Sequence, residues 1–205
     1  MQDYLPRIQD LLAPYPFVPA DAAEKILAHL QLVLKWGKSM NLTGATKVKE
    51  LIEEHAADAM PLAALLSPNA AVLDVGAGAG FPGVILAIMR PDITVTLLES
   101  NHKKGVFLRT ALREAGRKGV AIDGDVFAPP TEWLQGFDAV VSRAVFAPEK
   151  WVEVGAPFVK TGGTLYALLA GVQAPTPPTT LSAVATHEYR LVSGAKRSIA
   201  MYKKA

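Results

Sequence analysis

The segment from Ala71 to Gly83 holds the clearest chemical signal in the chain. Its apolar start ends at an acid, Asp74, and four glycines then follow within eight residues: Gly76, Gly78, Gly80 and Gly83. Glycine permits positive φ angles and lets the backbone come close to a ligand. A helical pattern follows, and the first turn of a helix offers unpaired N–H groups to a polar or negatively charged group. The segment therefore predicts a turn that binds a nucleotide-type cofactor at the end of a first parallel strand.

Two registers of this turn compete. Gly78-x-Gly80-x-x-Gly83 fits a dinucleotide fingerprint, whereas Gly76-x-Gly78-x-Gly80 after Asp74 fits a turn for S-adenosylmethionine (SAM). A carboxylate at this place can accept hydrogen bonds from a cationic amino-acid group, directly or through water, but it would repel a pyrophosphate. Pro82 also removes a backbone donor that a phosphate would use. The sequence favours SAM, with an NAD-type cofactor and a purely structural turn as the alternatives.

A second acid, Glu99, ends the next predicted strand, residues 93–98. Ligands of doubly wound sheets bind beyond the carboxyl ends of the strands. A carboxylate there can accept hydrogen bonds from both ribose hydroxyls of the cofactor, which SAM and NAD share. The alternative is a solvated acid that opens the following helix, where the helix dipole favours negative charge.

The third predicted strand, residues 119–123, leads into Asp123-Gly124-Asp125-Val126-Phe127. One of the two acids is expected to accept the adenine amino group, while Val126 and Phe127 cover the ring. Which acid does so stays open, and a turn acid without a cofactor role is the alternative. Asp138, just before the fourth strand, is predicted to be structural.

Composition narrows the class of protein. The chain has 205 residues, half of them apolar, a net charge of +2 and no cysteine. The length and the apolar content suit one domain with a substantial core. The absence of cysteine excludes disulfides and thiolate chemistry. No apolar run approaches the ~20 residues that a membrane span needs, so a cytoplasmic location is expected. The four histidines are scattered in sequence, and no metal site is predicted.

The pattern of the chain changes near residue 69. Residues 1–68 read as a helical extension, with helices near 5–12, 22–37 and 49–66. Residues 69–205 alternate strands and helices, which implies an α/β, doubly wound, mostly parallel sheet. Seven strands are predicted, at 70–75, 93–98, 119–123, 137–142, 163–168, 183–192 and 197–203.

Several motifs together resemble the bacterial small-subunit (16S) ribosomal RNA guanine-N7 methyltransferases, the GidB/RsmG family. The resemblance runs from about Asn41 to Gly171, and its most specific parts are Gly80-Phe81-Pro82-Gly83 and Ser142-Arg143-Ala144. It also covers Asn41-Leu42-Thr43, Glu54-His55-x-x-Asp58, Leu97-Leu98-Glu99-Ser100, Lys103-Lys104 with Phe107-Leu108, and Phe137-Asp138-x-Val140. Two positions depart from the family pattern, Glu54 and Ala170, where basic residues are usual.

The resemblance implies a class I SAM-dependent methyltransferase of Rossmann-like fold whose last strand is inserted antiparallel. It implies methyl transfer to N7 of a guanine in 16S rRNA, with the small ribosomal subunit or an assembly intermediate as partner and a monomeric enzyme. Phe81 joins the cofactor residues, and Arg143 is expected to touch the carboxylate end of SAM, the guanine or a phosphate. N7 carries a lone pair and no proton, so no general base is expected and catalysis is mostly positioning.

Basic residues cluster after Glu99. Lys103 and Lys104 open a predicted helix, and Arg109, Arg113 and Arg117 follow at a spacing of four, which predicts one helical face. This face and Arg197 near the C-terminus are candidate RNA contacts, and a solvated face is the alternative. Two other functions stay open: a SAM-dependent methyltransferase that acts on a small molecule, and a non-catalytic protein that binds a nucleotide cofactor.

Overall fold

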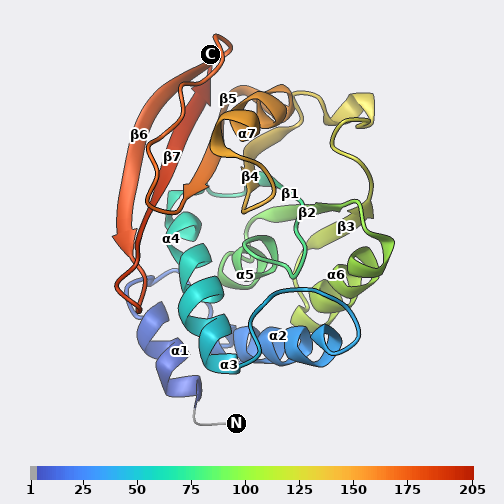
Figure 1. The fold of residues 1–205 in the computed structure, drawn as a ribbon, viewed down its shortest axis with the longest axis vertical. Helices are drawn as coiled ribbons and strands as arrows, with labels where there is room; N and C mark the ends of the chain where they lie inside the picture. Colours follow the sequence, from blue (N-terminus) through green and yellow to red (C-terminus); the bar gives the residue numbers. More distant parts are fainter. Residues whose placement is uncertain (1–3) are drawn as a thin grey trace.

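A computed structural model describes residues 4–205, and residues 1–3 of the predicted helical extension lie outside this range. Its centre is a seven-stranded sheet in the order β3-β2-β1-β4-β5-β7-β6 (Figure 1). The strands are β1 (Ala71–Val75), β2 (Thr94–Glu99), β3 (Gly119–Asp123), β4 (Phe137–Ser142), β5 (Val159–Leu169), β6 (Leu181–Arg190) and β7 (Lys196–Lys204).

The sheet is parallel from β3 to β5 and antiparallel at its other end. β7 lies between β5 and β6 and runs antiparallel to both. The predicted doubly wound sheet and its inserted last strand are therefore confirmed. The order reverses between β1 and β4, and a ligand crevice forms at such a reversal, beyond the carboxyl ends of the strands.

Helices cover both faces of the sheet (Figure 1). On one face lie α5 (Gly83–Met89) and α6 (His102–Ala115), with α2 (Ala22–Gly37) and α4 (Ala57–Leu65) packed against them. On the other face lie α7 (Pro148–Gly155) and the short turns η3 (Thr131–Trp133) and η4 (Ala156–Phe158). Successive strand residues point to opposite faces, so Val72 belongs to one apolar core and Leu73 to the other.

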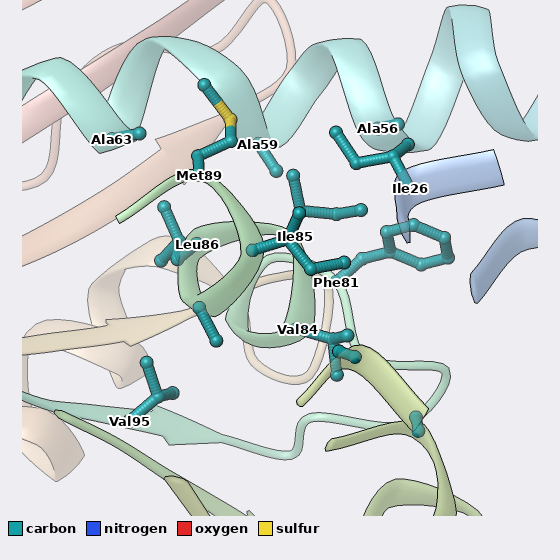
Figure 2. Packing of buried hydrophobic residues seen from close by; sticks show 14 of the residues in the cluster. Ile26, Ala56, Ala59, Ala63, Phe81, Val84, Ile85, Leu86, Met89 and Val95 are labelled. Carbon is teal, nitrogen blue, oxygen red and sulfur yellow. The ribbon is translucent and has the colours of Figure 1, made fainter. Parts of the chain in front are cut away.

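Small residues let α4 approach α5 closely. Figure 2 shows Ile85 and Met89 of α5 pointing toward the helix that carries Ala56, Ala59 and Ala63. These alanines have essentially no exposed surface, and their spacing of three and four places them on one helical face. The tight contact fixes α4 against the sheet and, with it, the helical turn that precedes α4.

The N-terminal helices are α1 (Leu5–Leu12), α2 and a third segment whose geometry changes along its length. That segment consists of α3 (Val48–Glu50), a π-helical turn η2 (Leu51–Ala56) and α4, rather than the single regular helix predicted from residue 49. Glu50 caps its start, because the carboxylate accepts hydrogen bonds from the backbone N–H groups of Thr46 and Lys47. π-Helical turns are rare and occur frequently at functional sites.

No helix within residues 4–205 combines the length and the apolar character that crossing a membrane would require.

Candidate functional site

Two adjoining cavities lie at the carboxyl ends of β1, β2 and β4. Their volumes are about 340 and 220 Å³, and they share Gly76, Ser100 and Val145 as lining residues. We call the pair the cleft. The larger cavity is lined by Leu42, Thr43, His55, Gly76, Ala77, Gly78, Ala79, Phe81, Glu99, Ser100, Lys104, Arg143, Ala144 and Val145. The smaller is lined by Val75, Gly76, Leu98, Ser100, Gly124, Asp125, Val126, Phe127, Val145 and Phe146.

Gly76 and Gly78 of the glycine turn form the floor of the cleft, whereas Gly80, predicted to join them, faces Val84 and His29 and does not line either cavity. Gly76, Gly78 and Gly80 have φ values of 70°, 54° and 85°, a region that L side chains rarely adopt. A Cβ atom on Gly76 would clash with the side chain of Val145. The backbone is thus exposed to the cleft where a side chain would fill it, as the sequence predicts for a cofactor turn.

Asp74 lies below this floor and does not line the cleft. Its side chain has no exposed surface, and Oδ2 accepts a hydrogen bond from Gly83 N at 2.8 Å. Oδ1 has no partner among the described residues. Burial raises the pKa of this carboxyl to about 7, against the lowering effect of the Gly83 N–H group and of Arg143. The orphaned oxygen is the kind of group that a ligand donor or a water molecule satisfies.

Glu99 lines the cleft and is held rigidly. Oε2 accepts a hydrogen bond from Gly78 N at 3.0 Å, and Oε1 accepts one from Asn101 N at 2.9 Å. The side chain is buried, so it is not the solvated helix-opening acid considered as the alternative. Asn101 fills that role, because its side chain caps α6 through the N–H groups of Lys103 and Lys104. Each Glu99 oxygen retains acceptor capacity for one further donor.

The two acids after β3 separate clearly. Asp123 is paired with His102 Nδ1 at 2.6 Å and with Arg109 Nη1 at 2.9 Å, away from the cleft lining. Asp125 lines the smaller cavity, and Oδ1 accepts a hydrogen bond from Phe127 N at 3.0 Å. The structure thus brings Asp125, Val126 and Phe127 together beside the apolar Leu98 and Val145. This wall suits a flat heteroaromatic ring with an exocyclic donor.

Arg143 projects from the end of β4 into a cluster of side chains. Nη2 lies 2.7 Å from His55 Nδ1, and Nη1 lies 3.3 Å from Asp58 Oδ2. The guanidinium also sits over the Phe81 ring, 5.4 Å from its centroid. Tyr189 completes the group, since its hydroxyl donates to Asp58 Oδ1 at 2.7 Å. We call these four polar residues, His55, Asp58, Arg143 and Tyr189, the Arg143 cluster.

His55 is held neutral in this cluster. A guanidinium can only donate hydrogen bonds, so Nδ1 must be the acceptor and Nε2 carries the proton. Nε2 lies 3.3 Å from Thr43 Oγ1, which can accept that proton's hydrogen bond. Burial and then the Arg143 charge lower the pKa of His55 to about 4, although nearby carboxylates oppose the shift. The imidazole therefore works as a fixed acceptor that orients Arg143.

Three of these residues, His55, Asp58 and Tyr189, were not among the predicted site residues. His55 and Asp58 did belong to the Glu54-His55-x-x-Asp58 motif of the resemblance, and their i, i+3 spacing puts them on one side of a helical segment. Tyr189 gave no local signal, because it meets Asp58 only through the antiparallel placement of β6.

The predicted basic face of α6 is only partly present. Lys104 lines the cleft, and Lys103 and Arg113 are exposed on the helix. Arg117 does not share that face, contrary to the prediction, because α6 ends at Gly116 in the left-handed conformation. The chain then turns, and Arg117 pairs with Asp21 at 2.5 Å.

Arg197 lies outside the cleft, with Nε 3.8 Å from Asp58 Oδ1 and Nη2 4.0 Å from Glu54 Oε2. Asp138 is structural, as predicted: Oδ2 accepts a hydrogen bond from Ala71 N at 2.8 Å, and the side chain pairs with Lys160. Within residues 4–205, no group of three or more metal-ligating side chains is placed to hold an ion.

Comparison with known proteins places the chain in a family. Residues 22–188 match the family model described as rRNA small subunit methyltransferase G. A relative with the name ribosomal RNA small subunit methyltransferase G, from Anaeromyxobacter dehalogenans strain 2CP-1, is 37% identical over 91% of this chain and 92% of its own length. A protein of the same name from Myxococcus xanthus is 31% identical over 91% of this chain and 90% of its own length.

Solved structures agree on the fold. A TehB-like SAM-dependent methyltransferase from Corynebacterium glutamicum has a TM-score of 0.56 and 15% identity, over 87% of this chain and 99% of that one. The M. jannaschii TYW2 structure in complex with AdoMet has a TM-score of 0.54 and 14% identity, over 72% of this chain and 75% of that one. With its sheet order, its cleft and its relatives, the chain belongs to the rRNA small subunit methyltransferase G family, a family of SAM-dependent methyltransferases.

Proposed function

We propose that this protein transfers the methyl group of SAM to N7 of a guanine in 16S rRNA of the small ribosomal subunit. The observation that carries the proposal is similarity over 91% of the chain to proteins whose names specify small-subunit ribosomal RNA. The geometry of the cleft supports it in two ways: one wall fits SAM, and the other lacks the groups that a proton-abstracting reaction would need.

The cofactor wall fits the parts of SAM in order. Glu99 would accept hydrogen bonds from the ribose hydroxyls, and Asp125 would accept one from the adenine amino group. Val126 and Phe127 would cover the adenine, and the backbone of Gly76, Gly78 and Phe81 would line the methionine portion. The orphaned Asp74 Oδ1 would receive the ammonium group, directly or through a water molecule.

The acceptor wall suits a nucleophile that carries no proton. The carboxylates that line the two cavities, among the described residues, are Glu99 and Asp125. Both are assigned to the cofactor, Glu99 to the ribose and Asp125 to the adenine, and His55 Nδ1 accepts its hydrogen bond from Arg143. SAM supplies an electrophilic methyl group. Its sulfonium would leave as a neutral thioether when the methyl group moves to N7, and the positive charge would pass to guanine, so no residue of this chain would have to move a proton.

Arg143 is the residue we assign to positioning. Its guanidinium is fixed by His55, Asp58 and the Phe81 ring, and it faces the cleft where donor and acceptor must meet. A planar guanidinium can hold a carboxylate, a phosphate or O6 of guanine by hydrogen bonds, and contact through O6 leaves the N7 lone pair free to attack. Holding the acceptor in line with the methyl group is the main contribution that this reaction asks of the protein.

Lys103, Lys104, Arg113 and Arg197 are proposed contacts to RNA phosphates. Arg109 is engaged with Asp123, so an RNA contact there must compete with that ion pair. We also propose a monomer in the cytoplasm, with residues 1–68 as a helical extension of one compact domain whose methyltransferase core spans residues 69–205. Phosphate contacts predict that product formation falls steeply as salt rises.

The direct test uses labelled SAM, the purified protein and small ribosomal subunits from cells that lack this enzyme. RNA from the reaction is treated with borohydride and aniline, which cleave the chain at N7-methylguanine. The expected result is transfer of label and cleavage at one site. Subunits from cells that contain the enzyme are the control, and they should accept no label because the site is already methylated.

The same assay identifies the form of RNA that accepts the methyl group and distinguishes the proposed function from its alternatives. Naked 16S rRNA is compared with assembled subunits to define which of them is the substrate. Measurable SAM binding without label transfer to either RNA would contradict the proposal. It would point to the small-molecule methyltransferase or to the non-catalytic cofactor-binding protein.

A further inference from the structure

A separate groove of about 700 Å³ lies between the β6–β7 hairpin and the loop that follows β5. We call it the hairpin groove. Its charged lining residues are three cations, Arg190, Lys196 and Arg197, and one acid, Glu188. Figure 1 shows the turn end of this hairpin beside α4, the helix that carries Asp58. A concave surface with excess positive charge concentrates polyanions.

We propose that the hairpin groove binds the phosphate backbone of the acceptor RNA, and that Asp58 and Tyr189 are positioning residues which couple this groove to Arg143. The inference rests on the proposed function and deepens it, because it names where the RNA backbone lies and how its binding reaches the cleft.

Arg197 is the best-placed phosphate contact because the protein itself holds it loosely. Its distances to Asp58 and Glu54, 3.8 and 4.0 Å, are ion-pair distances beyond hydrogen-bonding range. Nη1 donates to the Lys196 carbonyl at 3.1 Å. The N–H groups on Nε and Nη2 thus lie near two carboxylates, but no acceptor among the described residues is within hydrogen-bonding distance of them. Phosphate oxygens are the acceptors that such a guanidinium fork fits.

Asp58 lies between the hairpin groove and the cleft. Its buried carboxylate receives Tyr189 on Oδ1 at 2.7 Å and Arg143 on Oδ2 at 3.3 Å. Tyr189 precedes Arg190 on β6, and both line the groove. Burial and then the Asp58 charge raise the pKa of the Tyr189 phenol, so its hydroxyl stays protonated and remains a donor. One carboxylate therefore connects the β6–β7 hairpin to the residue that faces the acceptor base.

The charges around Asp58 indicate how RNA bound in the hairpin groove would affect Arg143. The Asp58 carboxylate faces two guanidinium groups, those of Arg143 and Arg197. A phosphate in the groove supplies Arg197 with an anion of its own, so the Asp58 charge acts on Arg143 alone. RNA bound in the groove and an ordered Arg143 then favour the same arrangement, and by linkage each strengthens the other.

The first test measures groove contacts. In Arg197→Ala and Lys196→Ala, KM for small subunits should rise about tenfold, the loss expected for a charge-assisted contact. The plot of log(kcat/KM) against log salt concentration should become shallower by about 0.7 for each lost phosphate contact. SAM affinity should not change. Lys150→Ala on α7, an exposed lysine paired with Glu153, is the matched control and should leave all three quantities unchanged.

The second test measures positioning. Tyr189→Phe removes only the hydroxyl, and we expect kcat to fall about tenfold at saturating RNA, with a smaller rise in KM for subunits through the same linkage and with SAM affinity near wild type. Tyr166→Phe is the matched control, since its hydroxyl donates to the Leu65 carbonyl at 3.0 Å and has no link to Arg143. In the double variant Tyr189→Phe/Arg197→Ala, kcat/KM should fall by less than the product of the two single-variant losses. The difference measures the coupling between the two residues.

The outcomes separate the inference from the proposed function. If the wild type methylates subunits while Arg197→Ala and Lys196→Ala keep their KM and salt dependence, the groove is not the RNA site. If Tyr189→Phe loses no more kcat than Tyr166→Phe, the positioning role is wrong. A third outcome is that the wild type binds 16S rRNA in a filter assay, the groove variants do not, and no methyl group is transferred. The hairpin groove would then be an RNA site, and the proposed function would be wrong.

Discussion

The two walls of the cleft differ in where their parts come from. On the cofactor side, Asp74, the glycine turn and Glu99 come from one strand–turn–helix–strand unit, and main-chain N–H groups hold both acids in place. Only the proposed adenine wall, Asp125 to Phe127, comes from a later segment, the loop after β3. The Arg143 cluster takes one side chain each from η2, α4, the end of β4 and β6, between residues 55 and 189. Most of the proposed cofactor site is therefore built from one short stretch of chain. The acceptor side is assembled by the tertiary fold, so its parts can change separately.

The buried acid on the cofactor side gives the largest expected effect, on the pH dependence of stability. The pKa of Asp74 is raised from 3.8 to about 7 by burial. The folded protein therefore keeps this proton up to about pH 7, while the unfolded chain loses it near pH 3.8. The resulting stabilisation is fully present below pH 3.8 and is lost as pH rises through 7, a change of as much as about 4 kcal/mol.

Chemical unfolding at several pH values measures this difference. Asp74→Asn removes the titration, so its unfolding free energy should fall less between pH 4 and 8 than that of the wild type. Asp92→Asn is the control of opposite sign, because its hydrogen bond from Arg90 lowers the pKa of Asp92 to about 2. Its stabilisation is present above pH 3.8 and is lost as pH falls through 2. Identical pH profiles for wild type and Asp74→Asn would show that Asp74 is charged in the folded protein.

Glu99→Ala should separate binding from turnover on the cofactor side. The variant loses the acceptor for the ribose hydroxyls and releases Gly78 N, so SAM affinity should fall about 100-fold or more. At saturating SAM, kcat should stay near the wild-type value. Isothermal titration and single-turnover assays give the two constants. Glu114→Ala, on the exposed side of α6, serves as control, and an unchanged SAM affinity in Glu99→Ala would remove Glu99 from the cofactor site.

Arg143→Ala should show the reverse pattern on the acceptor side. We expect kcat to fall on the order of 100-fold, the effect of a misplaced reacting group, with little change in SAM affinity. Arg143→Lys should recover little, because an ammonium group cannot bond His55 and Asp58 with the geometry of the planar fork. If Arg143→Ala instead weakens SAM binding, Arg143 holds the cofactor carboxylate and the two walls are not independent. Wild-type values for both constants would remove it from the site.

This division also explains what the sequence could predict. The strands, the parallel part of the sheet and the glycine turn could be predicted from local pattern, because apolar periodicity and glycine spacing are properties of neighbouring residues. The inserted antiparallel last strand was implied only by the family resemblance. The position of Glu99 at the cleft could be predicted as well, since ligands of such sheets bind beyond the carboxyl ends of the strands. Asp123 and Asp125 could not be separated in sequence, because the choice depends on His102 and Arg109 reaching one of them across the β3–α6 contact.

The sequence did not predict features that depend on where a helix ends or on a contact between residues far apart in the chain. Arg117 left the expected basic face because Gly116 ends α6 and Asp21 lies within reach. Tyr189 met Asp58 only because β7 is inserted between β5 and β6, which brings the hairpin to the side of α4. Spacing rules describe neighbours within one element, and these contacts join elements up to 131 residues apart.

The smallest expected effect tests whether the acceptor side stores backbone strain next to Arg143. Ala144 has a φ of 58°, in the left-handed region that disfavours residues with a Cβ atom. Ala144→Gly should raise the unfolding free energy by up to about 1 kcal/mol, since the relief of strain exceeds the added entropy of the unfolded chain. Gln135→Gly is a matched control, because Gln135 has a φ of 56° and lies on the surface after η3, away from the cleft lining.

Both variants should be more stable, but only Ala144→Gly should lose turnover. We expect kcat to fall severalfold with SAM affinity intact, because a freer backbone lets Arg143 move off the acceptor. Equal turnover in the two variants would mean that the His55 and Asp58 contacts alone fix Arg143, and that the backbone at Ala144 contributes nothing to the acceptor wall.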